Sequence, residues 1–592
     1  MKNEQFEYTI SSEDEVIKEC QKILFEKFKI HSNILFKKIK NGLSSKKIDV
    51  LFYLNNDAPL NSGEFKILYS NAEKKKITIY AKGIYSLFGG IGYVLKHIHF
   101  KNNDIDIELE NIVRIKPKSI FRGCLCANHP FRNNYCEWDV FDWQDYIKDM
   151  ALWGNNIIWT DGMEIFPGVI PYNKPPEYLN LKIHNEWKRQ SSIQGVLPNI
   201  ARKFGLEFGI WYPPNGIYEM QVDNLLKKGI KIFANDFEHR KYVCPSNKRA
   251  REIILYEREC MFSRFSRIDH FFVPSADNGG CVCSSCQPWV KTYLELCEEQ
   301  YKILQKYHPG AKLWVSNQKL GENQTRILCE ELKKSKYDWI YGIVFGPHGW
   351  NLKYLYEKLH KRYKILLYSD ITHTSRSQYQ MLNSSYPLNI IVGREALIGV
   401  RPHEFNRIFL STIKYSDGIS PYSEGIYDDF NKFLWSSFVQ DEEKTCEEII
   451  MDYATMYFGY NVRKKFLELV LLLEKNWITD IKDNIFKINE ALLLIEEIYY
   501  DIKGSFKFNN WRLEIFRMEC MMFKLVWLWL VKGRKNKKFQ IFFNKTLKVR
   551  EYIYSLCKLK MVPDWSFKWM NTEDYNHEKC IKAKDNLIIQ GV

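Results

Sequence analysis

The sequence predicts an α/β protein built around a (β/α)8 TIM barrel, with a small N-terminal α/β domain and a C-terminal helical domain. Between residues 116 and 427, short apolar strand patterns alternate with amphipathic helices, which is typical of a parallel sheet. Several of these strands end in an acid, and TIM barrels carry their chemistry at the carboxyl ends of the strands. Residues 1–115 mix strands with a helix, whereas residues 428–592 carry helical patterns alone.

The composition is typical of a globular protein with several domains. The 592 residues are too many for one core, and 45% of them are apolar and 27% charged. The net charge is +15, but the lysines are spread along the chain, so we expect no nucleic-acid partner. Residues 1–15 lack the apolar run of a signal peptide, and the most apolar window, 521–531, is too short to cross a membrane. We expect a soluble, cytoplasmic protein without a membrane partner, of unspecified oligomeric state.

The N-terminal domain is predicted from a helix and three strands. Residues 13–28 show helical spacing of apolar residues after an SSEDE cap, and residues 48–54, 64–70 and 75–81 are strand-like. A glycine-rich helix follows over residues 82–98. Its GGIG run lacks the Lys-Ser/Thr of a phosphate-binding P-loop, so we favour close helix packing as the reason for the glycines.

Eight strand patterns account for a closed barrel. They are SIFRGCL (119–125), NNIIWTD (155–161), LEFGIWYPP (206–214), DHFFVPSAD (269–277), AKLWVSNQ (311–318), WIYGIVFG (339–346), YKILLYSD (363–370) and DGISPYSEG (417–425). A ninth pattern, GIKIFAND (229–236), is interpreted as an excursion after the third strand. In the alternative it is strand four, which moves Asp277 to strand five and leaves the last pattern outside the barrel.

After residue 428 the apolar residues recur at three and four spacing, which predicts a helical domain. The helical segments are NKFLWSSF (431–438), CEEIIMDYATMYF (446–458), RKKFLELVLLLEKNW (463–477), INEALLLIEEIYYDI (488–502) and RLEIFRMECMMFKLVWLWLV (512–531). Their aromatic and Met residues are interpreted as packing core.

Polar and aromatic residues follow the predicted strand ends, so the topology gathers them on one rim. They are Asp161, Glu164, Trp211, Tyr212, Asp277, Asn278, Gln318, His348, Asp370, His373, Tyr422 and Glu424. Two carboxyl groups beside aromatic rings are what glycoside hydrolysis requires, one to protonate the leaving oxygen and one to support the sugar centre. In the structural alternative, some of these acids pair with arginines or cap helices.

The cysteines Cys281, Cys283 and Cys286 form a CxCxxC motif after the fourth strand. Three thiolates at this spacing can bind a structural Zn²⁺ with a fourth ligand from elsewhere, and no other cofactor is expected. The candidates for the fourth ligand are Cys244, Cys124, Cys126 and His129. The competing interpretation is three unpaired thiols in a reducing cell.

Three stretches together resemble the superfamily of barrel glycoside hydrolases that includes family 20 β-hexosaminidases, family 84 O-GlcNAcase-like enzymes and family 67 α-glucuronidases. The stretches are residues 121–159, 273–289 and 415–435, and the latter two carry VPSAD and YSEG motifs similar to those of uncharacterised bacterial barrel proteins. The resemblance implies a barrel glycosidase with a small domain before the barrel and helices after it.

The resemblance also implies roles for the acids. In families 20 and 84 an acidic pair closes strand four; one acid positions the substrate's acetamido group and the other protonates the leaving oxygen. Asp277 matches the first acid, but Asn278 stands at the second and cannot act as one. The acid would then be Glu424, with Asp161 and Asp370 as alternatives. If two carboxylates act directly, as in α-glucuronidases, the candidates for binding a uronate are Arg122, Arg394 and Arg401.

The sequence therefore predicts an exo-acting glycosidase for a short oligosaccharide or glycoconjugate, with Asp277 and Glu424 as catalytic residues. An N-acetyl-β-hexosaminide is favoured as substrate over a uronide. Two other classes compete with this prediction: a non-catalytic carbohydrate-binding barrel, which Asn278 favours, and a zinc-dependent hydrolase.

Overall fold

The computed structural model of the chain describes residues 5–9, 18–19, 22–24, 35–39, 43–44, 48–54, 60–72, 75–101, 104–128, 134–161, 185–217, 234, 242–276, 280–372, 399–503, 510–533 and 535–556. The predicted helix over residues 13–28 falls largely outside this part. Its described residues, 18–19 and 22–24, are helical.

The N-terminal region forms a seven-stranded mixed sheet of order β2-β1-β3-β4-β6-β5-β9. The strands are β1 (Gln5–Thr9), β2 (Leu35–Ile39), β3 (Leu43–Ser44), β4 (Ile48–Leu54), β5 (Phe65–Asn71), β6 (Lys75–Ala81) and β9 (Ile112–Ile115). A separate hairpin joins β7 (Ile98–Lys101) to β8 (Asp104–Ile107). The predicted strand patterns thus correspond to β4, β5 and β6.

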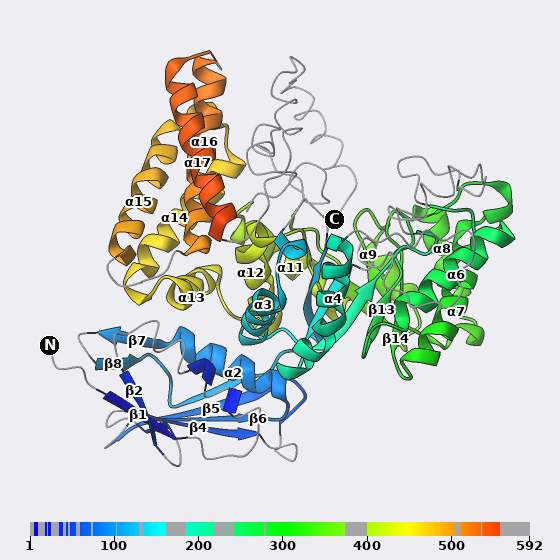
Figure 1. Ribbon diagram of the computed structural model, residues 1–592, viewed down its shortest axis with the longest axis horizontal. Helices are drawn as coiled ribbons and strands as arrows, with labels where there is room; N and C mark the ends of the chain where they lie inside the picture. Colours follow the sequence, from blue (N-terminus) through cyan, green and yellow to red (C-terminus); the bar gives the residue numbers. More distant parts are fainter. Residues whose placement is uncertain are drawn as a thin grey trace.

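The helix α2 (Ile84–Lys96) joins this sheet to the rest of the molecule, because it packs on β5 and β6 and also on α3 (Val140–Leu152) (Figure 1). A Cβ atom at Gly92 would lie 1.7 Å from the backbone oxygen of Leu152. Only glycine permits this approach of the two helices. The prediction that the glycines of this segment serve packing is confirmed.

The barrel contains the eight predicted strands in chain order. They are β10 (Phe121–Cys126), β11 (Ile157–Asp161), β12 (Glu207–Trp211), β13 (His270–Phe272), β14 (Lys312–Ser316), β15 (Ile340–Phe345), β16 (Lys364–Leu367) and a last strand in two parts, β17 (Gly418–Ile419) and β18 (Tyr422–Ser423). Neighbouring strands pair in parallel, and β10 pairs with β11 on one side and with β17 and β18 on the other. The sheet is therefore closed, which confirms the predicted (β/α)8 fold.

The ninth strand pattern does not enter the barrel. β12 pairs directly with β13, with Gly209 opposite His270, so nothing lies between strands three and four. The alternative that placed residues 229–236 as strand four is wrong. Of those residues only Ala234 lies within the described part, and its amide donates to the carbonyl of Tyr242 (3.1 Å).

A helix follows each barrel strand and covers the outside of the sheet. In chain order these are α3, α4 (Asn185–Lys203), α6 (Lys248–Phe262), α7 (Trp289–Tyr307), α8 (Glu322–Glu331), α9 (Leu352–Lys358), α11 (Pro402–Thr412) and α12 (Asp429–Gln440). All residues of α12 are buried, because it packs on β10, on α11 and on the next helix, α13 (Cys446–Tyr457).

Aromatic side chains fill the barrel interior. Phe121, His270, Trp314 and Tyr341 pack ring against ring with centroid distances of 5.0–6.4 Å. Between them His270 is fully buried, and its two ring nitrogens contact Glu207 (2.8 Å) and the Trp314 indole nitrogen (3.0 Å). The barrel is a packed core, so any site must lie at its ends.

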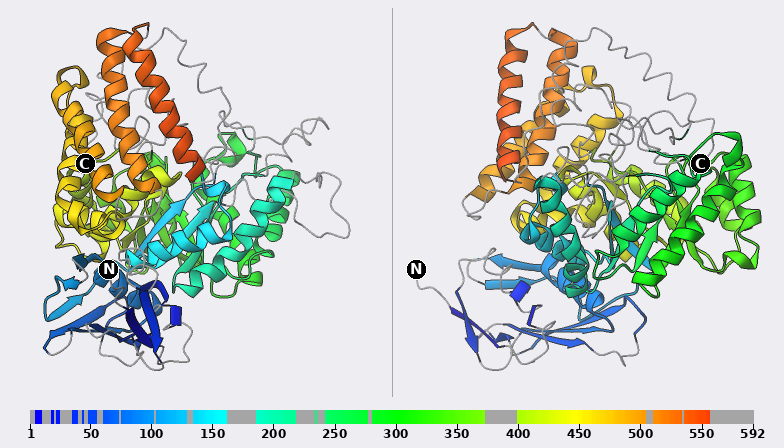
Figure 2. Two further views of the ribbon diagram at one scale, coloured as in Figure 1. Left: turned by 60° about the vertical axis from the view of Figure 1, so that its left-hand side comes forward. Right: turned by 45° about the vertical axis from the view of Figure 1, so that its right-hand side comes forward.

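The C-terminal helices are α13, α14 (Arg463–Ile478), α15 (Ile485–Lys503), α16 (Trp511–Lys532) and α17 (Lys537–Leu556). They lie beside the barrel: α13 packs against α2, and α15, α16 and α17 extend away from the N-terminal sheet (Figures 1 and 2). Consecutive members of the series pack on one another. Within the described part of the chain, no helix has the length and apolar character needed to cross a membrane.

Candidate active site

The carboxyl ends of the barrel strands bring several predicted residues to one rim. Asp161, Trp211, Tyr212, Gln318, Asp370, Tyr422 and Glu424 lie at or just beyond the ends of β11, β12, β14, β16 and β18, and all are buried. Asp277, Asn278, Glu164, His373, Arg394 and His129 lie outside the described residues. The predicted pairing of Asp277 with Glu424 therefore stays a prediction.

Tyr422 is the centre of the described rim. Its hydroxyl donates to Glu424 Oε1 (2.8 Å), and its ring packs 5.3 Å from Tyr368 and 6.5 Å from Trp211. Burial raises the pKa of Tyr422, and the negative charges of Glu424 and Asp161 add to this effect. Asp161 lies opposite Trp211 in the pairing of β11 with β12, and its charge also raises the pKa of Tyr212. Two carboxylates and a set of aromatic rings thus meet across β11, β12 and β18.

A buried acid beneath the rim holds the backbone of Glu424. The Glu424 amide donates to Asp428 Oδ2 and to Thr372 Oγ1, both at 3.1 Å, and the Ser423 hydroxyl donates to Asp428 Oδ2 (3.0 Å). Burial raises the pKa of Asp428 to about 7, although the charge of Lys432 and these hydrogen bonds oppose the rise. Neither Asp428 nor Thr372 is among the residues predicted from the sequence. The sequence signal that could have indicated Asp428 is the acidic pair at 428–429, about one helical turn after Glu424.

Lys432 of α12 extends this buried network. Its ammonium group donates to the carbonyl of Gly425 (3.1 Å) and to the Tyr135 hydroxyl, which itself contacts Ser423 Oγ (2.8 Å). The turn that carries Glu424 is therefore fixed from below by side chains of α12, η1 (Asn134–Cys136) and the segment after β16.

The strand-four and strand-five ends are joined through Ser275, whose hydroxyl donates to the carbonyl of Gln318 (2.8 Å). Ser275 stands two residues before Asp277. His348, in contrast, is exposed with a φ of 57° in the turn after β15. Among the residues that the structure describes, it forms no hydrogen bond or ion pair with the buried rim.

Two of the three arginines predicted to bind a uronate are described by the structure, and they lie at different places on the barrel. Arg122 lies at the start of β10, at the opposite end of the barrel from the rim, and donates to the carbonyls of Gly154 (2.9 Å) and Ser119 (2.7 Å). The prediction that Arg122 binds a uronate is therefore wrong. Arg401 is buried at the start of α11, pairs with Glu404 (3.2 Å) and interacts with the charge of Asp370. Arg401 stays a candidate at the rim.

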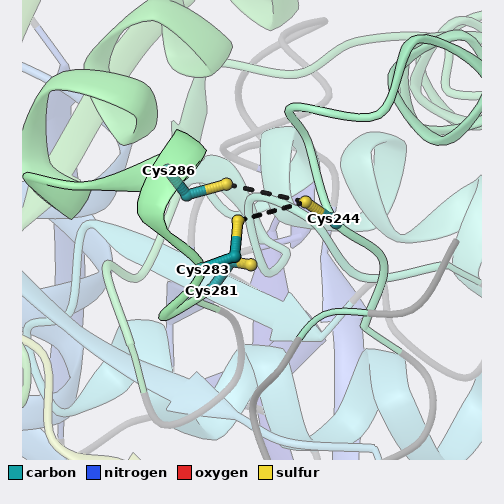
Figure 3. Close-up of side chains that lie close together, drawn as sticks. All are labelled: Cys244, Cys281, Cys283 and Cys286. Carbon is teal, nitrogen blue, oxygen red and sulfur yellow. Dashed lines mark hydrogen bonds between the residues drawn. The ribbon is translucent and has the colours of Figure 1, made fainter.

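The three cysteines of the CxCxxC motif meet Cys244 in front of α6 and α7 (Figure 3). All four Sγ atoms lie within 4.8 Å of one another. Cys124 and Cys126 are buried in β10, where Cys126 interacts with Tyr135 and Lys432. The prediction that either of them is the fourth ligand is therefore wrong. Cys244 alone of the predicted fourth ligands that the structure describes reaches the motif.

Comparisons with known proteins give likenesses in structure and none in sequence. No protein-family model and no curated protein matches the sequence. A GH138 enzyme that targets pectin rhamnogalacturonan II is 12% identical, with 99% of each chain covered and a TM-score of 0.55. A chitobiase of Flavobacterium johnsoniae is 12% identical, with 98% of this chain and 96% of that chain covered and a TM-score of 0.49.

A GH20 exo-β-N-acetylglucosaminidase of Vibrio harveyi is also 12% identical, with 85% of this chain and 75% of that chain covered and a TM-score of 0.46. At such identities a likeness speaks for the fold alone. The likeness to the GH138 enzyme agrees with the predicted TIM-barrel fold, and the relationship to barrel glycoside hydrolases stays a prediction.

Proposed function

We propose that the protein is a glycoside hydrolase that removes a terminal sugar from a short oligosaccharide or glycoconjugate, with an N-acetyl-β-hexosaminide as the favoured substrate. The observation that carries the proposal is the buried rim, where Asp161 and Glu424 lie beside Trp211 and Tyr422. Carboxyl groups among aromatic rings suit both the stacking of a sugar and the protonation of its leaving oxygen.

In this proposal Glu424 is the general acid and Asp277 orients the acetamido group of the substrate. The Tyr422 hydroxyl fixes the orientation of the Glu424 carboxyl group through its 2.8 Å hydrogen bond. The indole nitrogen of Trp211 is buried and has no hydrogen-bond partner among the described residues, so it offers a donor for a sugar hydroxyl. Asn278 binds substrate without taking part in proton transfer.

A uronide hydrolase is the second candidate, and Arg401 favours it. Its guanidinium group is buried near Asp370 at the rim, where a carboxylate-bearing sugar would find an opposite charge. A carbohydrate-binding barrel without turnover is the third candidate, and the amide of Asn278 favours it.

A panel of nitrophenyl glycosides separates the three candidates. We expect turnover of an N-acetyl-β-hexosaminide; turnover of an α-glucuronide alone would favour the uronide hydrolase. Absence of turnover across the panel, together with saturable quenching of tryptophan fluorescence by a sugar, would favour the binding protein and contradict the proposal.

Substitution of the two catalytic candidates tests their roles. Glu424→Gln should lower kcat/KM by about 10²- to 10⁴-fold, because general acid catalysis contributes about that factor. The loss should be smaller for a dinitrophenyl glycoside, whose leaving group needs little protonation. Asp277→Asn should abolish turnover and leave the circular dichroism spectrum unchanged.

The matched control is Glu330→Gln, because Glu330 is an exposed carboxylate on α8 that pairs with Lys333 in the turn after the helix. It should keep full activity. Equal losses in Glu424→Gln for good and poor leaving groups would contradict the assignment of Glu424 as general acid, and near-normal activity of Asp277→Asn would refute the role of Asp277.

A further inference from the structure

Four thiol groups from two separate segments converge beside the barrel. Cys244 comes from the chain between β12 and α6, and Cys281, Cys283 and Cys286 come from the chain between β13 and α7. Figure 3 shows the Cys244 sulfur facing those of Cys283 and Cys286 across the gap between the segments. These two distances are 3.7 Å and 3.6 Å. All four cysteines are free.

The spacing of the sulfurs is that of a tetrahedral metal site. In a tetrahedral zinc site with Zn–S bonds of about 2.3 Å, the sulfurs lie about 3.8 Å apart. The distances from Cys244 Sγ to Cys283 Sγ and Cys286 Sγ agree with this value, and the remaining pairs lie within 4.8 Å. Four sulfurs from two separate segments have this spacing, which ordinary core packing does not require.

The surroundings of the thiols suit anionic ligands. Cys281 and Cys286 are buried, and Cys244 and Cys283 are partly buried. Cys244 stands four residues before the start of α6 and Cys286 three residues before the start of α7, so both segments lead into helix N-termini, whose dipoles favour negative charge. The Ser246 hydroxyl lies 2.9 Å from Cys286 Sγ and 3.0 Å from the carbonyl of Ser285, which ties the two segments beside the sulfurs.

We propose that Cys244, Cys281, Cys283 and Cys286 bind one Zn²⁺ ion as four thiolates. Soft thiolate ligands in tetrahedral geometry select zinc among the abundant divalent ions. The protein supplies all four ligands, so no position is open for water and the ion has a structural role. A zinc-dependent hydrolase, which needs an open position, does not follow from this site.

The ion joins the chain that leaves strand three to the chain that leaves strand four. Asn215 already connects the same segments: its side chain accepts from the Gly280 amide (2.9 Å) and donates to the carbonyls of Val243 (2.9 Å) and Gly280 (2.8 Å). Gly280 and Cys281 follow Asp277 by three and four residues. Zinc therefore anchors the chain directly after the predicted catalytic acid.

Metal analysis of the full chain tests the site. Protein purified with a thiol reductant and without chelators should contain one equivalent of zinc. Cys244→Ala and Cys286→Ala should each lower the zinc retained after dialysis by at least about tenfold, since even the outer partners of a metal site affect affinity this much. Cys329→Ala is the matched control for Cys286→Ala, because Cys329 is as buried as Cys286 but lies on α8 outside the cluster, and this variant should keep its zinc.

A cobalt titration covers the case in which the cysteine variants fail to fold. Wild-type protein stripped with a thiol-reactive mercurial and a chelator, then reduced, should bind one equivalent of Co²⁺. The bound ion should give the thiolate charge-transfer band and the strong visible absorption of tetrahedral cobalt, and added Zn²⁺ should remove both.

Purified protein that contains no zinc and takes up no cobalt, that contains iron instead, or that shows these cysteines as disulfides by mass spectrometry would overturn the proposal. None of these measurements depends on sugar turnover, so a failure of the proposed glycosidase activity leaves them unaffected.

Discussion

At the scale of single residues, Asp428 shows how a buried acid supports the rim without being part of it. One of its oxygens accepts hydrogen bonds from the Glu424 amide, from Ser423 and from Thr372. Thr372 comes from the chain after β16, more than fifty residues away in sequence. Residues this far apart in sequence meet only because the barrel closes, and no local pattern records their contact. Glu424 could therefore be predicted from the sequence, whereas the residues that hold it could not.

The raised pKa of Asp428, about 7 against an ordinary value of 3.8, predicts a pH dependence of stability. Between these values the folded protein keeps the proton while the unfolded chain releases it. The free energy of unfolding should therefore fall as pH rises, by about 1.4 kcal/mol for each pH unit, and should level off above the folded pKa. Asp428→Asn should remove this contribution, and the difference between the two proteins in urea unfolding at pH 5 and pH 8 measures it.

Asp145→Asn is the control for this experiment, because Asp145 is an exposed aspartate at the surface of α3. Its stability curve should run parallel to that of the wild type. If Asp428→Asn also ran parallel to the wild type across this range, Asp428 would carry no proton in the folded protein and its burial would have another compensation.

At the scale of elements, the sequence predicts the eight strands but overestimates the length of most of them, and most of all that of the fourth and the eighth. The fourth pattern covers residues 269–277, yet β13 ends at Phe272, and the eighth pattern divides into β17 and β18. Each break coincides with a proline, Pro274 or Pro421, which has no amide to donate to the ladder. The apolar runs therefore predict which strands exist, and the prolines determine where the pairing stops.

The short β13 makes the following loop dependent on side-chain contacts, and Asn215 supplies three of them. Asn215→Ala should lower the free energy of unfolding by about 1–3 kcal/mol for each buried backbone group left without a partner. The amides of Val243 and Gly280 should exchange faster with deuterium, because the segments after β12 and β13 lose their connection.

Asn247→Ala is the matched control in the same region. Asn247 caps α6 through the Ala250 amide (3.1 Å) and does not join the two segments. Its loss should cost about 1 kcal/mol and leave the exchange of Gly280 unchanged. Unchanged exchange of Gly280 in Asn215→Ala would show that the asparagine does not hold the loop.

At the scale of the whole molecule, the order of regions follows from the change in hydrophobic period along the chain. The period predicts an α/β region, a barrel and a helical region, as the structure has them. It does not predict how they contact one another, because those contacts depend on single residues such as Gly92 on α2 and Arg512 on α16. Both residues lie inside helical patterns that would tolerate many other side chains.

Arg512 connects the C-terminal helices to the first and last helices of the barrel. Its guanidinium group binds Asp429 of α12 (2.7 Å) and Asp149 of α3 (3.0 Å), and it stacks on Tyr457 of α13 (3.8 Å). Both carboxylates are buried. Arg512→Met would leave two buried negative charges without a cation, so it should lower the free energy of unfolding by about 3–5 kcal/mol.

Lys465→Met is the control, because Lys465 lies on α14 and its partners on α15, Glu497 and Asp501, are 59% and 40% exposed. An ion pair near the surface contributes about 0–1 kcal/mol, so this variant should unfold close to the wild type. Adding Asp149→Asn and Asp429→Asn to Arg512→Met should restore much of the lost stability, since the unpaired charges disappear with the arginine. Equal losses in Arg512→Met and Lys465→Met, measured by calorimetry at one pH, would show that the C-terminal helices are held by their apolar contacts and not by this buried arginine.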